Sequence, residues 1–173
     1  QGNLEMLQYA HTHGCPWGPD TCSSAAGNGN LACLQYAHEQ GCPWDAVTCE
    51  QAARYGNLAC LTYLHEHDCP WNANTCSGAA VRGHLCCLQY AHEHGCPWNS
   101  FTCHAASEAQ HLNCLQYAHT HGCPLDADTR QEKLLQGEQA GDECYVYVAE
   151  LCTAEDFAAV QFRRKVHLDC VVS

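Results

Sequence analysis

Cysteine and histidine are the residues of this sequence whose side chains could do chemistry, because seventeen cysteines and thirteen histidines occur among 173 residues. Thiolate and imidazole groups bind zinc, two thiols can form a disulfide, and a Cys–His pair can act as a nucleophile with its base. The Cys-Pro dipeptide recurs every 27 residues, at Cys15, Cys42, Cys69, Cys96 and Cys123. Any site built from these residues would therefore be copied along the chain.

Copying of this kind argues against an enzyme. A catalytic Cys–His pair normally occurs once, whereas each candidate pair here occurs four or five times. The sequence also contains no phosphate-binding loop and no carboxylate pair that stands out from its surroundings. We therefore expect neither catalysis nor a cofactor.

The residues around the Cys-Pro dipeptides repeat with the same period, which is typical of a solenoid. Leu34, Tyr36 and His38 each belong to a column that is filled in all five copies. Tryptophan fills four places of a further column, which ends in a leucine: Trp17, Trp44, Trp71, Trp98 and Leu125.

Each unit is predicted to contain two short helices. Thr21 is expected to cap a first helix through residues 22–26, which ends at Gly29. A second helix is expected at residues 31–40, because its apolar residues recur at three- and four-residue spacings. Proline then keeps the link to the next unit extended, and Thr48 is expected to begin the next pair.

Residues 48–58, TCEQAARYGNL, resemble the Thr-Pro-Leu-His-x-Ala-Ala-x-x-Gly-His-Leu pattern of ankyrin repeats. The ankyrin period is about 33 residues, so about six residues are missing here, in the part of the unit where the family carries its projecting hairpin. The chain therefore resembles a short ankyrin variant, rich in Cys, His and Trp, that is common in predicted proteins of algae, oomycetes and giant viruses. The resemblance implies an all-α, ankyrin-like solenoid of stacked antiparallel helix pairs.

Two domains are predicted. Residues 1–128 form the repeat array, a half-repeat followed by four repeats, and residues 129–173 form a C-terminal helical cap. The cap is expected to contain a helix near residues 142–151, with Cys144, Val148 and Leu151 along one side, and a helix at 154–165 capped by Thr153. The basic cluster at 163–165 would complement the dipole of that last helix. The apolar residues expected to cover the final repeat are Leu151, Phe157 and Val160.

Three interpretations of the cysteines remain open. The resemblance places the repeated cysteines at buried Leu, Val and Ala positions of the family, so reduced thiols packed in the core are favoured. Alternatively, zinc could be bound by a set such as Cys22, His38, Cys42 and a neighbouring residue, Cys49 or Cys15. Disulfides such as Cys15–Cys22 would require an oxidising compartment.

Two further columns have structural and functional interpretations. The second histidine column contains His13, His67, His94 and His121, and is expected to be a half-exposed row at helix ends rather than a chelating one. The tryptophans either cover the seams between units or form an exposed adhesive row.

A partner-binding surface is predicted where the copies differ from one another. The differences gather in the loop after tryptophan and on the outer side of the first helix of each pair. Ankyrin proteins usually bind partners through hairpin tips and first helices, and this chain keeps only the first helices. We call the predicted surface the first-helix strip, with the residues Val47, Glu50, Arg54, Tyr55, Arg82, Phe101, His104 and Glu108.

Charge narrows the classes of partner. The net charge is −12, and residues 1–128 contain two basic residues against eleven acidic ones, so a nucleic-acid partner is not expected. The sequence also contains no apolar run of about 20 residues, the length that a membrane span needs.

The expected function is a protein-interaction scaffold or a peripheral or linker subunit of a larger assembly, and a zinc-binding repeat protein is the alternative. An algal source would make an organellar membrane complex one compatible host. The sequence does not fix the compartment, although a reducing, intracellular one is favoured.

Overall fold

The computed structural model of the chain describes residues 2–136 and 142–161. Within these residues the protein is helical and contains no β-strand. The helices are α1 (Gly2–Thr12), α2 (Pro19–Gly27), α3 (Leu31–Glu39), α4 (Ala46–Arg54), α5 (Leu58–Glu66), α6 (Ala73–Val81), α7 (Leu85–Glu93), α8 (Ser100–Glu108), α9 (Leu112–Thr120), α10 (Ala127–Gln136) and α11 (Glu143–Leu151). A further helix follows at residues 154–161.

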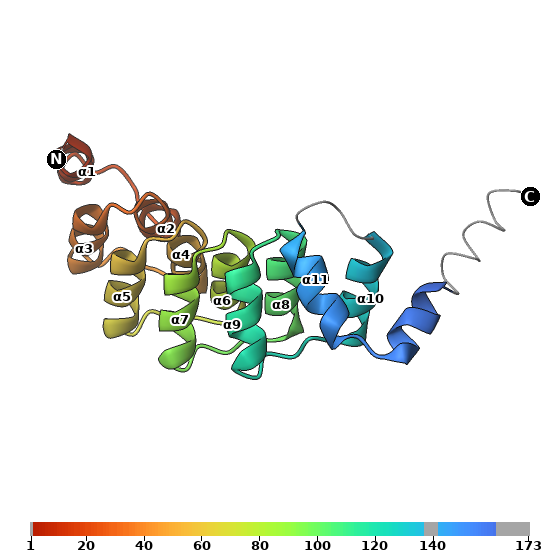
Figure 1. Cartoon of the computed structure of the whole chain (residues 1–173). Coiled ribbons are helices and arrows are strands. Elements are labelled where there is room, and N and C mark those ends of the chain that lie inside the picture. Colours follow the sequence, from red (N-terminus) through yellow and green to blue (C-terminus); the bar gives the residue numbers. More distant parts are fainter. Residues whose placement is uncertain (1, 137–141, 162–173) are drawn as a thin grey trace, which may run out of the picture.

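The helices form two layers, as Figure 1 shows. One layer contains the first helices of the pairs, α2, α4, α6, α8 and α10, and the other contains the second helices, α1, α3, α5, α7, α9 and α11. A tight turn of three residues joins α4 to α5, so the two helices of that pair run antiparallel. The predicted all-α, ankyrin-like solenoid is therefore confirmed.

The first helices begin earlier than the sequence pattern predicts. Asp45 is the N-cap of α4, and its side chain accepts a hydrogen bond from a backbone amide in the first turn. Asn72 and Asn99 cap α6 and α8 in the same way. The prediction that Thr48 starts a helix is wrong, because the threonine lies inside the first turn, where its Oγ1 accepts from the Asp45 amide at 3.4 Å.

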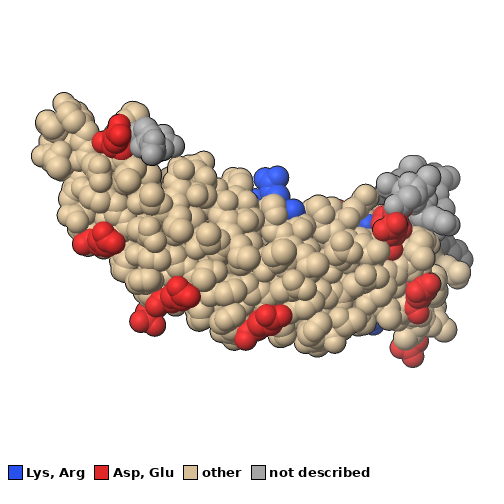
Figure 2. All heavy atoms as spheres, turned by 60° about the vertical axis from the view of Figure 1, so that its left-hand side comes forward, with Lys and Arg blue, Asp and Glu red and all other residues tan. Residues whose placement is uncertain are grey.

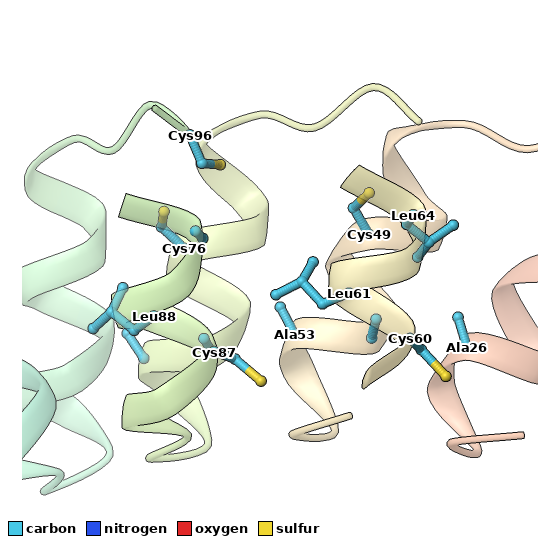
Figure 3. Close-up of a cluster of buried hydrophobic side chains, with 14 of the residues drawn as sticks. Ala26, Cys49, Ala53, Cys60, Leu61, Leu64, Cys76, Cys87, Leu88 and Cys96 are labelled. Carbon is cyan, nitrogen blue, oxygen red and sulfur yellow. The ribbon is translucent and has the colours of Figure 1, made fainter. Parts of the chain in front are cut away.

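Small residues allow the first helices to pack closely against each other. Ala52, Ala53, Ala79 and Ala80 are fully buried on α4 and α6. The second helices contribute larger buried side chains, and Figure 3 shows several of them facing the first-helix layer. The core is therefore one continuous row of alanine, leucine and cysteine along the array.

A glycine follows each of the first helices α2, α4 and α6 and packs against the next unit. Gly56 has a φ of +74°, and a Cβ built on it would lie 2.6 Å from Nδ1 of His84. Gly41, which ends a second helix, has a φ of +77° but has no atom within 4 Å of such a Cβ. The two glycines therefore share a left-handed backbone and differ in their surroundings.

We expect Gly41→Ala to lower the free energy of unfolding by about 1–2 kcal/mol, the cost of a left-handed alanine. Gly56→Ala should cost more, because the His84 ring must also move. Urea unfolding of both variants measures the difference. Equal losses would show that the contact between Gly56 and His84 is easily relieved.

The helix stacking continues beyond the repeats. α10 packs on α8 and α11 packs on α9, and Nδ1 of His119 lies 2.9 Å from the Tyr147 hydroxyl. The same contact joins His38 to Tyr63 at 2.9 Å between two regular units. α11 thus takes the place of another second helix. The predicted boundary at residue 128 lies inside α10, and the division into two domains stays a prediction.

Two of the residues expected to cover the final repeat do not do so. Leu151 is 37% exposed and Phe157 is 43% exposed, whereas Val160 is buried, as predicted. Tyr147 contacts the histidine of the preceding unit, as Tyr117 does in the regular array, so the two tyrosines occupy equivalent positions. Leu151, four residues after Tyr147, is therefore equivalent to His121, an exposed residue at the end of a second helix. The expected burial of Cys144 and Val148 is confirmed.

Thr153 caps the last described helix, as predicted. Its Oγ1 accepts from the Asp156 amide at 3.3 Å, and Oδ2 of Asp156 accepts from the Thr153 amide at 2.9 Å. Asp156 also pairs with Arg130 of α10, with Nε 3.1 Å from Oδ2. These contacts lower the pKa of the Asp156 carboxyl, the backbone amide most of all and against the effect of burial. The basic cluster at 163–165 lies outside the described residues.

Candidate protein-binding surface

The first-helix strip exposes three large apolar side chains. Val47 is 46% exposed, Tyr55 is 53% exposed and Phe101 is 57% exposed. They lie on or directly after α4 and on α8, two first helices separated by α6. The structure therefore leaves the predicted anchors open to a partner.

A hollow of about 290 Å³ brings several strip residues together. Glu50 and Arg54 of α4 form one wall, and Phe101 of α8 forms the opposite wall. Gly78 lies between them, and a Cβ there would lie 3.5 Å from Arg54 Cβ, so the glycine keeps the hollow open. The complete lining is Glu50, Arg54, Asn74, Ser77, Gly78, Val81, Phe101 and Ala105.

A second hollow, of about 390 Å³, lies between α2 and α4. Tyr55 is the aromatic residue of its wall, and the remaining lining residues are small or polar: Ser23, Ser24, Gly27, Asn28 and Gln51. An ideal Cβ on Gly27 would lie 3.5 Å from the Tyr55 ring. Each hollow therefore has one exposed aromatic ring at its edge.

The charged residues of the strip other than Arg82 already have partners within the chain. Arg54 lies 3.8 Å from Glu50, and His104 lies 3.9 Å from Glu132 of α10. Glu108 accepts two hydrogen bonds from Nε2 of Gln136, at 2.8 and 3.0 Å. The structure thus ties His104 and Glu108 to α10.

The predicted strip is only partly one site. Glu50, Arg54 and Phe101 share a hollow and Tyr55 borders the other, whereas Val47 and Arg82 line neither of the two. The small residues of the walls, such as Ser77 and Gly78, were not predicted. Both residues lie on α6, the helix between α4 and α8. They could have been predicted from the stacking order, because any groove between α4 and α8 has α6 as its floor.

Charge is distributed unevenly over the molecule. Figure 2 shows basic side chains at one long edge of the array and most of the visible acidic side chains along the opposite edge. The two basic residues of the four units, Arg54 and Arg82, end α4 and α6. Glu39, Glu66 and Glu93 end the second helices and are exposed. The first-helix side is therefore the less acidic one.

The tryptophans form a regular row with histidine and tyrosine. His38 stacks on Trp44 with ring centroids 3.8 Å apart, and Tyr63 of the next unit meets the Trp44 ring edge-on at 6.3 Å. The remaining His–Trp stacks have centroid separations of 3.8 to 4.2 Å: His11–Trp17, His65–Trp71 and His92–Trp98. Because all four indoles are partly buried in these contacts, they cover the seams between units, as the structural interpretation predicts.

Burial and a neighbouring histidine lower the pKa of two imidazoles in this row. For His38 the neighbour is His67, and for His92 it is His121. Both shifts favour the neutral ring, which stacks on tryptophan without the cost of desolvating a charge.

The second histidine column ends the second helices. His67, His94 and His121 are C-cap residues, and Nδ1 of each lies 2.8 Å from the carbonyl of the tyrosine four residues earlier. The exposed position at a helix end is therefore confirmed.

Thirteen of the sixteen described cysteines are buried, and all sixteen are free thiols. Cys15 is exposed, contrary to the expectation that every Cys-Pro cysteine fills a core position, because the described chain has no first helix that covers it. Desolvation raises the pKa of Cys87 and of Cys114 to about 11, so these thiols are protonated core residues.

The four residues of the zinc alternative are not brought together. Cys22 contacts Cys42 and Cys49 contacts Cys69, while His38 is engaged with Trp44 and Tyr63. Among the residues that the structure describes, no group of three or more His, Cys, Asp or Glu side chains is placed to hold a metal ion. Cys22 also lies against Cys42 rather than against Cys15, the partner suggested for a disulfide. The zinc alternative stays a prediction.

None of the described helices has the length and apolar character that crossing a membrane would require.

The paired helices, their tight turns and their stacking define an ankyrin-like helical solenoid. The crystal structure of the human ASB11 ankyrin repeat domain is similar, with a TM-score of 0.60 and 18% sequence identity over 77% of this chain and 69% of that chain. No protein-family model and no curated protein matches the sequence. The resemblance to ankyrin repeats is thus confirmed for the fold, while the variant rich in Cys, His and Trp stays a prediction.

Proposed function

We propose that the chain is a non-enzymatic interaction scaffold, or a peripheral or linker subunit of a larger assembly, that binds a protein through the first-helix strip. The main support is the exposure of Tyr55 and Phe101 at the edges of two hollows on that side. Exposed aromatic side chains beside pockets are typical of the residues that dominate protein interfaces. A large membrane-protein complex of an algal organelle is a host compatible with the repeat variant.

The partner that fits this surface presents an apolar side chain to the hollow beside Phe101 and a polar one to the hollow beside Tyr55, whose other lining residues are small or polar. The side chain of Arg54, in the wall of the hollow between α4 and α8, is 40% exposed and can also pair with a carboxylate of the partner. Ankyrin-like folds offer a rigid surface, so binding requires little ordering of the chain.

The test first isolates the partner by a pull-down with the unchanged chain. The affinity of that partner is then compared between the unchanged chain and the Tyr55→Ala and Phe101→Ala variants. Truncating an aromatic residue at the centre of an interface costs about 2 kcal/mol or more, so each variant should bind about 30-fold more weakly. Tyr9→Ala is the matched control, because Tyr9 on α1 is 66% exposed and lies outside the strip. Circular dichroism should show unchanged helicity in all three variants.

Unchanged affinity of both strip variants would place the binding surface elsewhere on the molecule. If Tyr9→Ala lost as much affinity as the strip variants, the binding surface would likewise not be confined to the first-helix strip. Elemental analysis of the purified chain tests the zinc alternative separately, because about one zinc per repeat would favour it.

A further inference from the structure

The two histidine columns meet at the seams between units. The first column stacks on the tryptophans, and the second column ends the second helices. At three seams a ring of the first column lies edge-on to a second-column ring of the next unit. These seam histidine pairs, with their centroid separations, are His38 and His67 at 5.4 Å, His65 and His94 at 5.3 Å, and His92 and His121 at 5.8 Å. Each pair joins two neighbouring second helices, whereas the His-x-His spacing within one helix points its two rings in different directions.

The separation of the paired rings is close to that of two imidazoles on one metal ion. Because a bond between a metal ion and an imidazole nitrogen is about 2.0–2.1 Å long, two imidazoles that share an ion have ring centroids roughly 5 Å apart. The ring planes of the pairs are inclined to each other by 71° to 84°, so neither ring covers the face of the other. The distance therefore suits one shared ion at each of these seams.

A hydrogen bond determines which nitrogen of each second-column ring is free. Nδ1 of His67 lies 2.8 Å from the backbone carbonyl of Tyr63, and a carbonyl only accepts, so Nδ1 carries the proton and Nε2 carries the lone pair. His94 and His121 make the same contact in the following units. Imidazoles that bind a metal through one nitrogen usually donate the other N–H to a carbonyl or carboxylate, as these rings do.

The first-column ring is held in place by its own contacts. His38 stacks on Trp44 at 3.8 Å, and its Nδ1 lies 2.9 Å from the hydroxyl of Tyr63. A tyrosine hydroxyl can accept from Nδ1–H, which leaves the Nε2 lone pair of His38 for a metal ion. Within the described residues no hydrogen bond uses Nε2 of His38 or of His67. The Tyr63 ring also lies 4.0 Å from the His67 ring, so one tyrosine positions both histidines of the pair.

The seam histidine pairs are accessible and lie beside negative charge. His67 is exposed and His38 is half-buried, so an ion in solution can reach this pair. Burial and His67 lower the pKa of the His38 imidazole, while Glu39 raises it, so the Glu39 carboxylate lies close enough to favour a cation at this seam. Glu66 and Glu93 follow the first-column rings of the other two pairs and are exposed in the same way.

We propose that each seam histidine pair binds one divalent transition-metal ion, of the class that includes Ni²⁺, Cu²⁺ and Zn²⁺, through its two Nε2 atoms. Imidazole is a preferred ligand of these ions, and water completes the coordination. Two protein ligands are fewer than the three or four of a usual zinc site, so binding is reversible and of moderate affinity. The bound ion joins the second helices of neighbouring units and stabilises the seam between them. The site requires no cysteine and no residue of the first-helix strip.

The two end seams of the described chain lack the second histidine. Gln40 is equivalent to His67 and lies at the seam of His11, and Leu151 has the equivalent position at the seam of His119. A glutamine amide is a poor ligand for this class of ion, and leucine offers no ligand atom. The chain therefore contains its own comparison between seams that can hold an ion and seams that cannot.

The first test counts and locates the ions with Ni²⁺ as the probe. The folded full chain is freed of metal with a chelator and alkylated, so that exposed thiols such as Cys15 and Cys86 cannot bind the ion. Titration calorimetry should then show one Ni²⁺ for each of the three pairs. In NMR spectra of the imidazole groups, paramagnetic Ni²⁺ should broaden the signals of the pairs before those of His11 and His13. The proposal is overturned if no ion binds, or if all exposed histidines broaden together.

A second test removes one ligand. His67→Gln introduces the residue that the chain itself has at the equivalent position 40, so the helices should be retained. Loss of even an outer-shell partner lowers metal affinity about 10- to 100-fold, so the affinity of this seam should fall at least as much, and one ion fewer should bind. His13→Gln is the matched control, because His13 is exposed in the same column but belongs to none of the three pairs. A His67→Gln chain that binds as many ions as the unchanged chain would contradict the proposal.

A third test adds a ligand. His11 already stacks on Trp17 at 3.8 Å and lies 3.1 Å from the Tyr36 hydroxyl, so Gln40→His should complete a further pair. Calorimetry should then count one additional Ni²⁺. This variant and His67→Gln also separate the seam histidine pairs from the zinc alternative, because neither position belongs to the set of Cys22, His38, Cys42 and Cys49. Ion counts that are unchanged in both variants would assign any bound metal to other residues and overturn the proposal.

Discussion

Replacing Leu61 with alanine is expected to lower the free energy of unfolding by about 3–5 kcal/mol. Leu61 on α5 is fully buried, and Figure 3 shows it close to Ala53 of the first-helix layer. Alanine would leave a cavity that the surrounding helices cannot fill, because the first helices are already packed through small residues. Urea or thermal unfolding followed by circular dichroism measures the loss.

Leu58→Ala is the matched control on the same helix. Leu58 is 37% exposed, so its truncation removes less buried surface and should cost less than 1.5 kcal/mol, roughly half the transfer energy of a buried leucine. Similar losses for the two variants would mean that the core between α4 and α5 relaxes around the cavity.

Replacing Lys133 with methionine is expected to cost about 3–5 kcal/mol, because a buried carboxylate would lose its counter-ion. Nζ of Lys133 lies 2.9 Å from Oδ2 of Asp142, and the two side chains are 2% and 3% exposed. Nζ also donates to the carbonyl of Ser107 on α8 at 3.2 Å. Lys133 therefore joins α10 to both α8 and the start of α11.

The double variant Lys133→Met, Asp142→Asn separates charge from packing. Asparagine can keep the N-cap hydrogen bond that Asp142 accepts from the Tyr145 amide at 2.8 Å, but it carries no charge. The double variant should recover much of the stability lost by Lys133→Met alone. A double variant that is less stable than Lys133→Met would show that the loss comes from packing rather than from the unpaired carboxylate.

The fold of the repeat array could be predicted from sequence because the same residue pattern recurs in five copies. Leu34 and His38, for example, recur at helical spacing in every unit, and both lie where the pattern places them. The pattern did not locate the N-caps, because Asp45 and Thr48 are both good capping residues and only the backbone decides which one precedes the first turn.

The C-terminal segment was harder to predict because it occurs once. Nothing in the local sequence indicates that Lys133 is buried, since its partner Asp142 lies nine residues away beyond the end of α10. Phe157 is apolar and was expected to cover the last repeat, yet the helix at 154–161 is held instead through the ion pair of Arg130 and Asp156. In both cases a polar contact between elements decides the packing.

The candidate surface was predicted in part. Variation among the copies identified Glu50, Arg54 and Phe101, which the structure places around one hollow. Gly78 was not selected, although its column also varies among the copies, because it has no side chain that could contact a partner. The closeness of a first-helix cysteine to the Cys-Pro cysteine twenty residues later was predicted for Cys22 and Cys42, as part of the zinc alternative, and the structure brings these two together.

The row of stacked indoles gives the protein a set of internal optical probes. The four tryptophans occupy equivalent seams along the array, three of them also touching a tyrosine of the next unit. A variant that keeps only Trp44 or only Trp98 would therefore report the opening of one seam through its emission spectrum. In a molecule whose units contact only their neighbours, the unfolding of the two ends could be timed independently by fluorescence.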